Sequence, residues 1–516
     1  MDTRKHVVIS ATKRTKATKQ QDLCRSSASF RQWGLPAVLI LTGLFVFLQL
    51  FREIWFDEAL TISLIARKTG ITDLYFAYEI PNNHIVYSML LAKWVQLLQF
   101  FSPDIYPWMY RLLSGITGLC CAAVLYRILI RKAGLISGTA AVFLWICSPV
   151  FLTFATGIRG YILGAFLILC LYCTAWKCYR SCRLKYLILF FLIVLLAAGT
   201  APTNLAGAAG VLILFFPSML LNRNRGRRRG IFIIMCFMVL LSVPVFYGAN
   251  FRELLGCLKL GEGWSSPGAA VWNLYSAWGI LLLPLGISAA AGFCRAWGKY
   301  PQIRCHLLAG LMVLLLPLPA YILFKAPPFP RVFFPLSPLV LLVLAFFSRF
   351  SFRGIFRQKS CRRSGKLSHY FVIFCLLWGF AGNRYAEQIS SFLYGRSTAD
   401  DLIQPYYMHR DFVPQKMIML LQQFLSDPAA KVFLSFRADY PALMYAAFSA
   451  GISQDKLCCD LPNLPPFTLK PEERKHFYIL SADEDDLQEL MTRFQLQDPV
   501  SIPGGTSLMR LDRFTD

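Results

Sequence analysis

The chain has 516 residues, of which 56% are hydrophobic, 15% aromatic and only 16% charged. This composition is too apolar for a soluble enzyme, and apolar runs of the roughly 20 residues that a bilayer requires recur from residue 33 to about 385. The net charge of +25 could suggest a nucleic-acid partner, but its placement argues against one. The basic residues form short clusters between apolar runs, and no basic groove interleaved with aromatics appears. Composition therefore indicates a polytopic membrane protein.

Residues 1–32 hold eight Lys and Arg residues and no hydrophobic stretch. No small-residue cleavage site follows them, so this segment is interpreted as a disordered basic arm and not as a signal peptide. An excess of Lys and Arg marks cytoplasmic segments. We expect the arm to lie on the cytoplasmic side.

The pattern from residue 33 to 385 predicts about eleven membrane-spanning helices within one domain. The expected spans are 33–51, 108–130, 135–154, 160–177, 184–200, 204–221, 231–249, 272–293, 305–324, 331–348 and 368–384. The linkers 177–185, 222–230, 294–304 and 349–367 carry 4, 5, 3 and 7 Lys or Arg residues and no acid. The positive-inside rule places all four in the cytoplasm.

The apolar stretch 83–101 does not fit this alternation as a span. It contains Asn83, His84 and Lys93, and it is better suited to the membrane interface. Residues 52–107 then form one long outer loop with interfacial helices. An odd number of spans also places residues 386–516 outside, so we expect a multi-pass protein of the cell (inner) membrane.

The acidic residues are confined to few places. Of 28 Asp and Glu residues, eighteen lie beyond residue 385, and residues 105–386 contain only Glu253 and Glu262. No predicted span carries an internal carboxylate, which weakens an ion-coupled transporter. Carboxylate chemistry is therefore expected on the outer face, where Asp57 and Glu58 directly follow the first helix.

Two interpretations of Asp57 remain open. Burial under interfacial helices would raise its pKa and make it a better base. Alternatively, Asp57 is the N-cap of an amphipathic helix over 58–68, with Glu58 favoured by the helix dipole. Capping would lower the pKa, but a capping carboxylate can still direct one oxygen at a ligand.

Residues 386–516 are expected to form a small α/β domain. Strands are predicted at 431–436 and 476–482, helices at about 439–450 and 483–494, and a hairpin over 501–514. No GxGxxG motif opens a helix, so no nucleotide site is indicated. The residues of this domain do not distinguish a cover over the active site from an acceptor-binding module.

The sequence resembles a known family. IWFDEALTISLIARKTG (54–70) and PNNHIVYSMLLAKWVQLL (81–98) are similar to the first outer loop of GT-C class membrane glycosyltransferases, including protein O-mannosyltransferases and lipid A aminoarabinose transferases. FATGIRGYILGAFLILCLY (154–172) resembles their second outer loop, and FPRVFFPLSPLVLLVLA (329–345) resembles a late Arg-aromatic-Pro motif. The match spans most of residues 33–385 and does not define the subfamily.

The resemblance implies a reaction. Such enzymes transfer a sugar from a polyprenyl-phosphate carrier, dolichyl or undecaprenyl, to an acceptor hydroxyl on the outer face. The acid at the position of Asp57 is the proposed general base, and inversion at the anomeric carbon is expected. The acceptor would be a glycan, a lipid or a protein.

The implied reaction requires positive charge that stabilises the leaving phosphate. Arg159 and Tyr161 at the start of one expected helix, Arg331 at the start of another, and Lys325 nearby are candidates. Arginine suits phosphate because its planar fork donates two hydrogen bonds. These cations could instead be interface anchors that reach to lipid head groups.

Glu58, Asn83 and His84 are candidates for contacts to the acceptor, the donor phosphate or a metal. Some relatives carry a further acid in the second outer loop, where this chain has Gly157-Ile158-Arg159. A divalent ion is therefore an open possibility, and Arg159 could take over its charge-neutralising role. No other cofactor is indicated.

Two other classes of function stay open. A transporter or flippase of lipid-linked saccharide would move its substrate without making a bond. A polymerase or ligase of surface polysaccharide would depend on Arg and His and would tolerate loss of Asp57.

Overall fold

The computed structural model of the chain describes a helical membrane region and parts of a C-terminal sheet. The described residues are 34–51, 54, 56–67, 70–76, 84–102, 105–220, 225–250, 267–319, 330–357, 370–375 and 377–378, with 422, 429, 431–434, 445, 447, 450–453, 456–458, 477–481, 500–502 and 506–510 in the C-terminal region. The expected N-terminal arm, 1–32, lies outside them.

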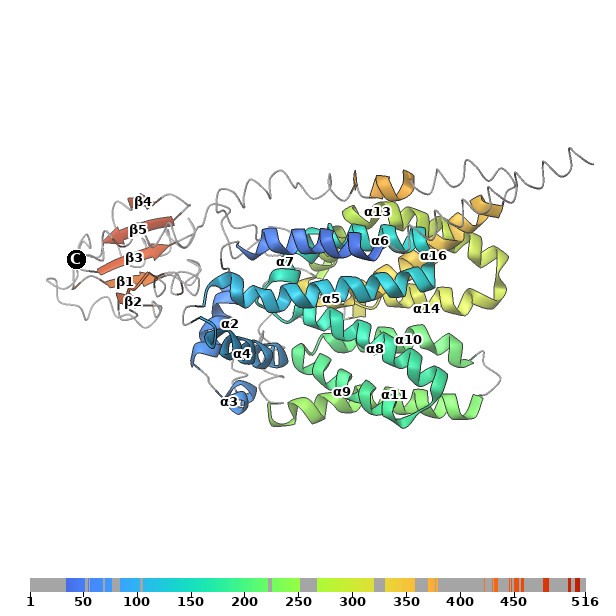
Figure 1. The fold of residues 1–516 in the computed structure, drawn as a ribbon, viewed down its shortest axis with the longest axis horizontal. Helices are drawn as coiled ribbons and strands as arrows, with labels where there is room; N and C mark the ends of the chain where they lie inside the picture. Colours follow the sequence, from blue (N-terminus) through green and yellow to red (C-terminus); the bar gives the residue numbers. More distant parts are fainter. Residues whose placement is uncertain are drawn as a thin grey trace, which may run out of the picture.

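Long helices run side by side in one bundle (Figure 1). The first is Gly34–Leu50. The others in the bundle are α5 (Pro107–Ala133), α6 (Leu135–Ile146), α7 (Pro149–Thr156), α8 (Tyr161–Ser181), α9 (Leu184–Thr200), α10 (Asn204–Leu220), α11 (Arg225–Tyr247), α13 (Pro267–Lys299), α14 (Arg304–Leu314) and α16 (Ser337–Arg357). The 3-10 helices are η1 (Gly248–Asn250), η2 (Pro301–Ile303) and η3 (Pro330–Leu336). The main apolar core gathers residues from α5 to α8 and from α16.

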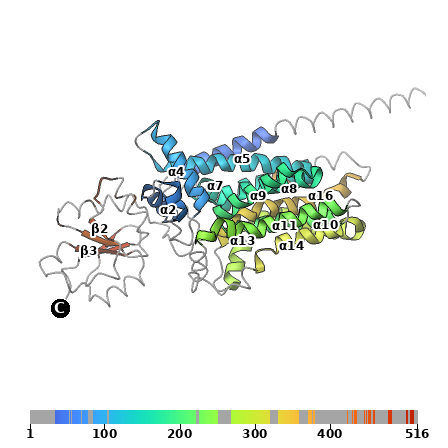
Figure 2. The same cartoon turned by 90° about the horizontal axis from the view of Figure 1, so that it is seen from below.

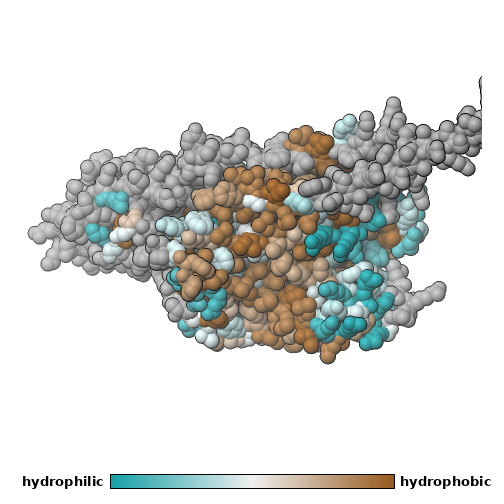
Figure 3. All heavy atoms as spheres, viewed as in Figure 1, coloured by the Kyte–Doolittle hydropathy of each residue, from teal (hydrophilic) through white to brown (hydrophobic). Residues whose placement is uncertain are grey.

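The bundle has the apolar surface of a membrane protein. Among the described residues four helices are long and apolar enough to cross a membrane, and the bent pair α6 and α7 would make a fifth. The four are Pro107–Ala133, Tyr161–Ser181, Gly226–Asn250 and Val332–Ser351; shorter apolar helices are Gly34–Leu50, Leu184–Thr200, Asn204–Met219 and Pro301–Leu314. Hydrophobic side chains cover the middle of the bundle, and hydrophilic ones lie toward its two ends (Figure 3). The protein is a multi-pass membrane protein.

The expected span 135–154 is wrong as one continuous helix. The chain breaks after Ile146, and α6 and α7 meet at an angle of 67°. Ser148 begins the second piece as an N-cap, and its hydroxyl accepts a hydrogen bond from the Phe151 amide. Pro149 occupies the first helical position, where its missing N–H is tolerated, but it could not continue α6. The Ser-Pro pair therefore makes the break.

Two later spans also differ from the expectation. The helix predicted over 305–324 ends at Leu314, and turns follow it. The helix predicted over 331–348 starts as η3 and becomes α-helical only at Ser337. Pro330 and Pro335 explain this start, because each lacks an amide hydrogen for a regular α-helix. By contrast, the predicted span 184–200 coincides with α9.

Three short helices lie at the end of the bundle where α5 begins, which we call the loop end (Figures 1 and 2). They are α2 (Phe56–Arg67), α3 (Ile71–Phe76) and α4 (Ile85–Gln99). Their buried apolar side chains, with Ile158, form a second core, against which Tyr445 of the C-terminal region also packs. The 15 residues of α4 extend about 22 Å, less than the roughly 30 Å of a hydrocarbon core. That the helices of this loop lie in the membrane interface stays a prediction.

The opposite end, which we call the basic end, is where α5, α8, α10 and α13 finish (Figure 1). Hydrophilic residues cover it (Figure 3). The basic linkers expected at 177–185, 222–230 and 294–304 connect the helices that meet there. The chain therefore separates its cationic linkers from the acidic pair by the length of the bundle.

The C-terminal region contains a five-stranded sheet in the order β2-β1-β3-β5-β4. The strands are β1 (Lys431–Leu434), β2 (Leu457–Cys458), β3 (Phe477–Ser481), β4 (Val500–Ile502) and β5 (Thr506–Arg510). β1 pairs in parallel with β2 and β3, whereas β5 is antiparallel to β3 and β4. The predicted strands near 431 and 476 and the hairpin after 500 are confirmed. The predicted helices of this region lie largely outside the described residues.

Candidate active site

The acidic pair lies in the first turn of α2. The helix begins at Phe56, so Asp57 and Glu58 are both helical residues and neither is an N-cap. Their carboxylates are favoured there by the positive end of the helix dipole. Only 5% of Asp57 and 0% of Glu58 is exposed, so both charges require partners inside the protein.

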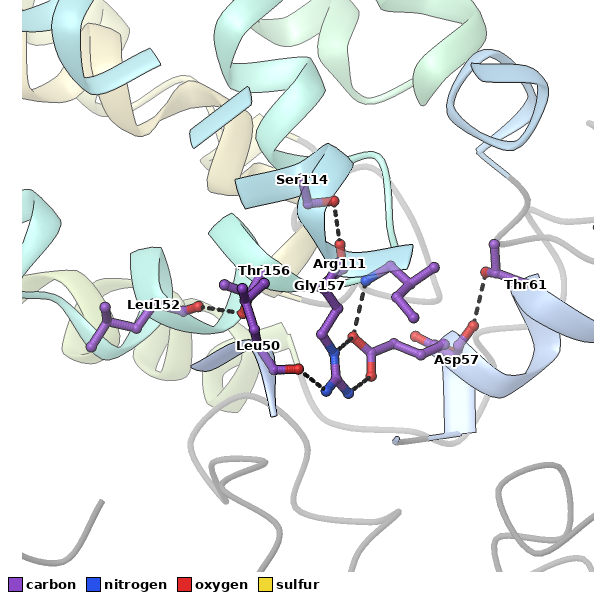
Figure 4. Close-up of polar contacts among 10 residues, drawn as sticks. Leu50, Asp57, Thr61, Arg111, Ser114, Leu152, Thr156 and Gly157 are labelled. Carbon is purple, nitrogen blue, oxygen red and sulfur yellow. Dashed lines mark hydrogen bonds and ion pairs between the residues drawn. The ribbon is translucent and has the colours of Figure 1, made fainter. Parts of the chain in front are cut away.

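Glu58 pairs with Arg111, near the start of α5. The Arg111 Nη2 and Nε atoms donate to the two Glu58 carboxylate oxygens at 2.6 and 3.3 Å, and neither side chain is exposed. Arg111 Nη1 also donates to the carbonyl of Leu50 at 2.9 Å (Figure 4). The guanidinium therefore joins the end of the first helix to α2 through one buried fork.

Glu58 also holds the bend that connects α7 to α8. Its Oε1 atom accepts a hydrogen bond from the Ile158 amide at 2.9 Å. The next residue along the bend is Arg159, and the residue before Glu58 is Asp57. A single carboxylate thus fixes the backbones of both residues relative to each other.

A second chain of hydrogen bonds reaches the same bend from α4 and α5. Ser114 donates to the carbonyl of Gly157 at 2.6 Å (Figure 4), and the Tyr87 hydroxyl lies 2.8 Å from the Ser114 oxygen. Because a serine has only one hydroxyl proton, Tyr87 must be the donor to Ser114. Burial raises the pKa of Tyr87 well above its ordinary value, although the bond to Ser114 acts in the opposite direction. Tyr87 therefore stays protonated and keeps donating.

Asp57 faces Arg159, which belongs to the bend that Glu58 and Ser114 hold. Arg159 Nη2 lies 3.1 Å from Asp57 Oδ2, and Nη1 donates to the Thr61 hydroxyl oxygen at 3.1 Å. The Thr61 hydroxyl in turn donates to the backbone carbonyl of Asp57 at 2.9 Å (Figure 4). The guanidinium of Arg159 therefore rests on the first turn of α2, against the carboxylate that the sequence singles out.

His84 and Tyr161 lie together next to Gly160, the residue that follows Arg159. Their rings meet edge to face at 4.7 Å, and His84 Nδ1 is 2.8 Å from the carbonyl of Thr200. Both side chains are buried. Tyr161 also contacts Phe154, whose ring packs on Phe334 of η3. The buried segment that follows Arg331 is thereby joined to the start of α8.

Three of the predicted site residues have no described side chain. Asn83 and Lys325 lie outside the described residues, and Arg331 is described only as part of the η3 backbone. Their roles stay predictions. The structure brings Asp57, Glu58 and Arg159 together at the bend, and it places His84 against Tyr161 and beside Gly160, the residue that follows Arg159.

Arg111 was missed by sequence reasoning. It is the fifth residue of the 27-residue helix α5, and the next charged residue along that helix is Arg127. An ionisable residue inside such a segment is a signal for a buried partner. The sequence did not indicate which of the outer acids would be that partner.

The donor set does not fit a divalent ion within the residues that the structure describes. No three His, Cys, Asp or Glu side chains come together there as metal ligands would. Instead, each carboxylate of the acidic pair meets a guanidinium. The positive charge at this site is supplied by arginine.

The arrangement offers two chemical functions next to each other. A carboxylate can accept a proton from a hydroxyl, and a guanidinium can bind and stabilise an anionic oxygen. Both groups lie at the loop end with little water contact, where electrostatic interactions are strengthened.

Solved structures with the same fold are known, although no protein-family model and no curated protein matches the sequence. ArnT from Cupriavidus metallidurans in the apo state aligns over 94% of this chain and 98% of its own, with 11% identity and a TM-score of 0.52. ArnT bound to undecaprenyl phosphate aligns over 93% and 98%, again with 11% identity and a TM-score of 0.52. The oligosaccharyltransferase AglB from Archaeoglobus fulgidus is matched at a TM-score of 0.48, with 11% identity, over 83% of this chain and 65% of its own.

The similarity to ArnT extends over nearly the whole of both chains, through the helical bundle and into the C-terminal region. This agrees with the resemblance of the first outer loop, which rests on different observations. At 11% identity the similarity shows the fold, and the chain has the GT-C membrane fold of ArnT.

Proposed function

We propose that this protein is a glycosyltransferase that moves a sugar from a polyprenyl-phosphate carrier to an acceptor hydroxyl on the extracytoplasmic face of the cell (inner) membrane. The observation that carries the proposal is the buried contact between Asp57 and Arg159, with 3.1 Å between Nη2 and Oδ2. This contact supports the roles of proton acceptor for Asp57 and of anion-binding group for Arg159. The GT-C fold, and the undecaprenyl phosphate bound to ArnT, support a lipid-phosphate donor.

In the proposed reaction Asp57 removes the proton from the acceptor hydroxyl. The acceptor oxygen attacks the anomeric carbon as the bond from that carbon to the phosphate oxygen breaks, and the electron pair leaves with the polyprenyl phosphate. Arg159 stabilises the negative charge on the departing phosphate. Attack from the side opposite the leaving group inverts the anomeric configuration.

Glu58 has a positioning role in this proposal. Both of its oxygens are bonded within the protein, to Arg111 and to the Ile158 amide. It holds the backbones that carry Asp57 and Arg159, and it does not touch the reacting atoms. His84 and Tyr161 would border the sugar or the phosphate on the other side of Arg159.

The orientation follows from charge. The cationic linkers lie at the basic end, which the positive-inside rule assigns to the cytoplasm. The loop end with the acidic pair, and the sheet of the C-terminal region, would then be extracytoplasmic. The acceptor, whether glycan, lipid or protein, would approach the site from that side.

The test uses the full chain in detergent with a panel of synthetic polyprenyl-phosphate hexoses and pentoses and a cell-envelope extract as the acceptor source. Release of polyprenyl phosphate is measured. We expect Asp57→Asn to lower this release by about 10²- to 10⁴-fold, the usual contribution of a general base.

The matched control is Asp73→Asn. Asp73 is an exposed acid in α3, so its replacement removes the same charge from the same loop without touching the site. Full transfer by Asp57→Asn would refute the assigned base. Movement of lipid-linked saccharide across proteoliposomes without release of polyprenyl phosphate would instead identify a transporter.

A further inference from the structure

The donor groups of Arg159 are only partly used. A guanidinium has five N–H donors, and Arg159 is 4% exposed. Nη1 donates to Thr61, but within the described part of the chain Nε and Nη2 find no hydrogen-bond partner. Nη2 meets Asp57 as an ion pair, without hydrogen-bond geometry.

Arg111 is the opposite case. It binds Glu58, which also accepts from the amide of Ile158, the residue before Arg159. All three Arg111 nitrogens donate, two to Glu58 and one to Leu50. Buried charged donors are normally satisfied, because an unfilled one costs free energy. The unfilled donors of Arg159 therefore indicate a ligand with several acceptor oxygens.

We infer that Arg159 exchanges partners during the reaction: it pairs with Asp57 in the ligand-free chain, and the phosphate of the polyprenyl carrier then draws it away, so that the donor binds before Asp57 can act as the base. This inference rests on the proposed function and adds an order of binding to it.

The exchange follows from competition for one cation. The phosphodiester of the donor offers two non-bridging oxygens, which can accept two parallel hydrogen bonds from the guanidinium fork, and its phosphate gains a third such oxygen when the sugar leaves; a single carboxylate oxygen near Nη2 does not match this. While Asp57 is paired with Arg159, its charge is stabilised and its attraction for a proton is weak. After the exchange it has lost a cation and gained an anionic neighbour, and both changes favour proton uptake.

The hydrogen bonds that hold the bend restrict such a movement to the Arg159 side chain. The Ile158 amide and the Gly157 carbonyl are tied to Glu58 and Ser114. The backbone of the bend is therefore fixed, and the exchange requires only a rotation of the Arg159 side chain. The base becomes active only when the donor is in place.

The experiment measures binding of undecaprenyl phosphate to the full chain in detergent, for the wild type, Asp57→Asn and the control Asp73→Asn. Removing the competing carboxylate should tighten binding by at least about tenfold, the size expected for a hydrogen bond to a charged group. Asp73→Asn should leave the affinity unchanged. Unchanged or weaker binding by Asp57→Asn would overturn the exchange.

A double mutant separates the exchange from plain charge repulsion between Asp57 and phosphate. In the Arg159→Gln background Asp57→Asn should change the affinity by less than about twofold, because no shared cation remains. An equal tightening in both backgrounds would assign the effect to repulsion and overturn the inference. Arg159→Lys, which keeps the charge but loses the fork, supplies a second background with an intermediate expected effect.

The same measurement distinguishes a failure of the exchange from a failure of the proposed function. A wild-type chain that does not bind undecaprenyl phosphate at all would overturn the proposed function and the exchange with it. Binding by the wild type without a response to Asp57→Asn would overturn the exchange alone.

Discussion

Two neighbouring carboxylates in one helical turn have different surroundings, and the difference separates structure from chemistry. Glu58 and Arg111 are both 0% exposed, and every Arg111 nitrogen and both Glu58 oxygens have partners. The side chains of Asp57 and Arg159 keep 7% and 5% exposure, and Arg159 retains donors without a partner among the described residues. The saturated pair stabilises the fold, and the open pair is suited to bind and react.

The largest effect on stability is expected at the saturated pair. Arg111→Leu leaves the Glu58 carboxylate buried without its counter-charge, which should destabilise the protein by about 3–5 kcal/mol. Denaturant unfolding in detergent measures this loss. The double variant Glu58→Leu with Arg111→Leu should recover much of the stability while transfer stays low, because the tie to Ile158 is lost. A single variant as stable as the wild type would contradict the structural role.

At the open pair the effect should fall on catalysis. Arg159→Gln removes the group that stabilises the leaving phosphate, and we expect kcat to fall by about 10²- to 10³-fold. Its loss of stability should be smaller than that of Arg111→Leu, since Asp57 is not completely buried. Steady-state kinetics and unfolding of the same preparations provide the comparison. Equal losses of stability in both variants would remove the distinction between the pairs.

Gly160 tests how tightly the bend must approach its neighbours. A Cβ atom there would lie 2.7 Å from Thr200 Cγ2, closer than such atoms pack, and 3.0 Å from His84 Cβ, which is a very tight contact. Gly160→Ala should therefore cost about 1–3 kcal/mol and displace Arg159 or His84. Gly226→Ala, where a Cβ would meet nothing within 4 Å, is the control. A neutral Gly160→Ala would show that the bend can relax.

The smallest expected effect concerns the hydrogen bonds that reach the bend from α4. Tyr87→Phe removes one buried bond, and we expect a loss of about 0.5–1.5 kcal/mol with transfer lowered only a few-fold. Ser114→Ala should be worse, because it leaves both the Tyr87 hydroxyl and the Gly157 carbonyl without this partner.

Tyr87 also predicts a dependence on pH. Its pKa in the folded chain is raised above the unfolded value of 10.0, chiefly by burial. Its contribution to stability is therefore complete below pH 10.0 and is lost as the pH rises above that value, since only the unfolded chain then releases the proton. Unfolding measured from pH 9 to 11 should show a steeper loss for the wild type than for Tyr87→Phe. Parallel curves would contradict the raised pKa.

Much of the membrane region was predictable because hydrophobic length is a local property. The expected span 184–200 coincides with α9, and the strands near 431 and 476 were found as predicted. The break at Ser148-Pro149 was missed, although its cap and proline signals were present, because the apolar run continued across it. The 3-10 start of the helix predicted from 331 was missed for the same reason.

By itself the sequence determined a multi-pass membrane protein with its cations at one set of linkers and an acidic pair beyond the first helix. These properties depend on composition and spacing, which a single chain displays directly. Only the tertiary structure decided that Glu58 meets Arg111, 53 residues away, and that Asp57 meets Arg159. Neighbouring carboxylates look equivalent in sequence. Their different roles arise because α2 directs Glu58 towards Arg111, whose donors are all used, and Asp57 towards Arg159, which has unused donors among the described residues.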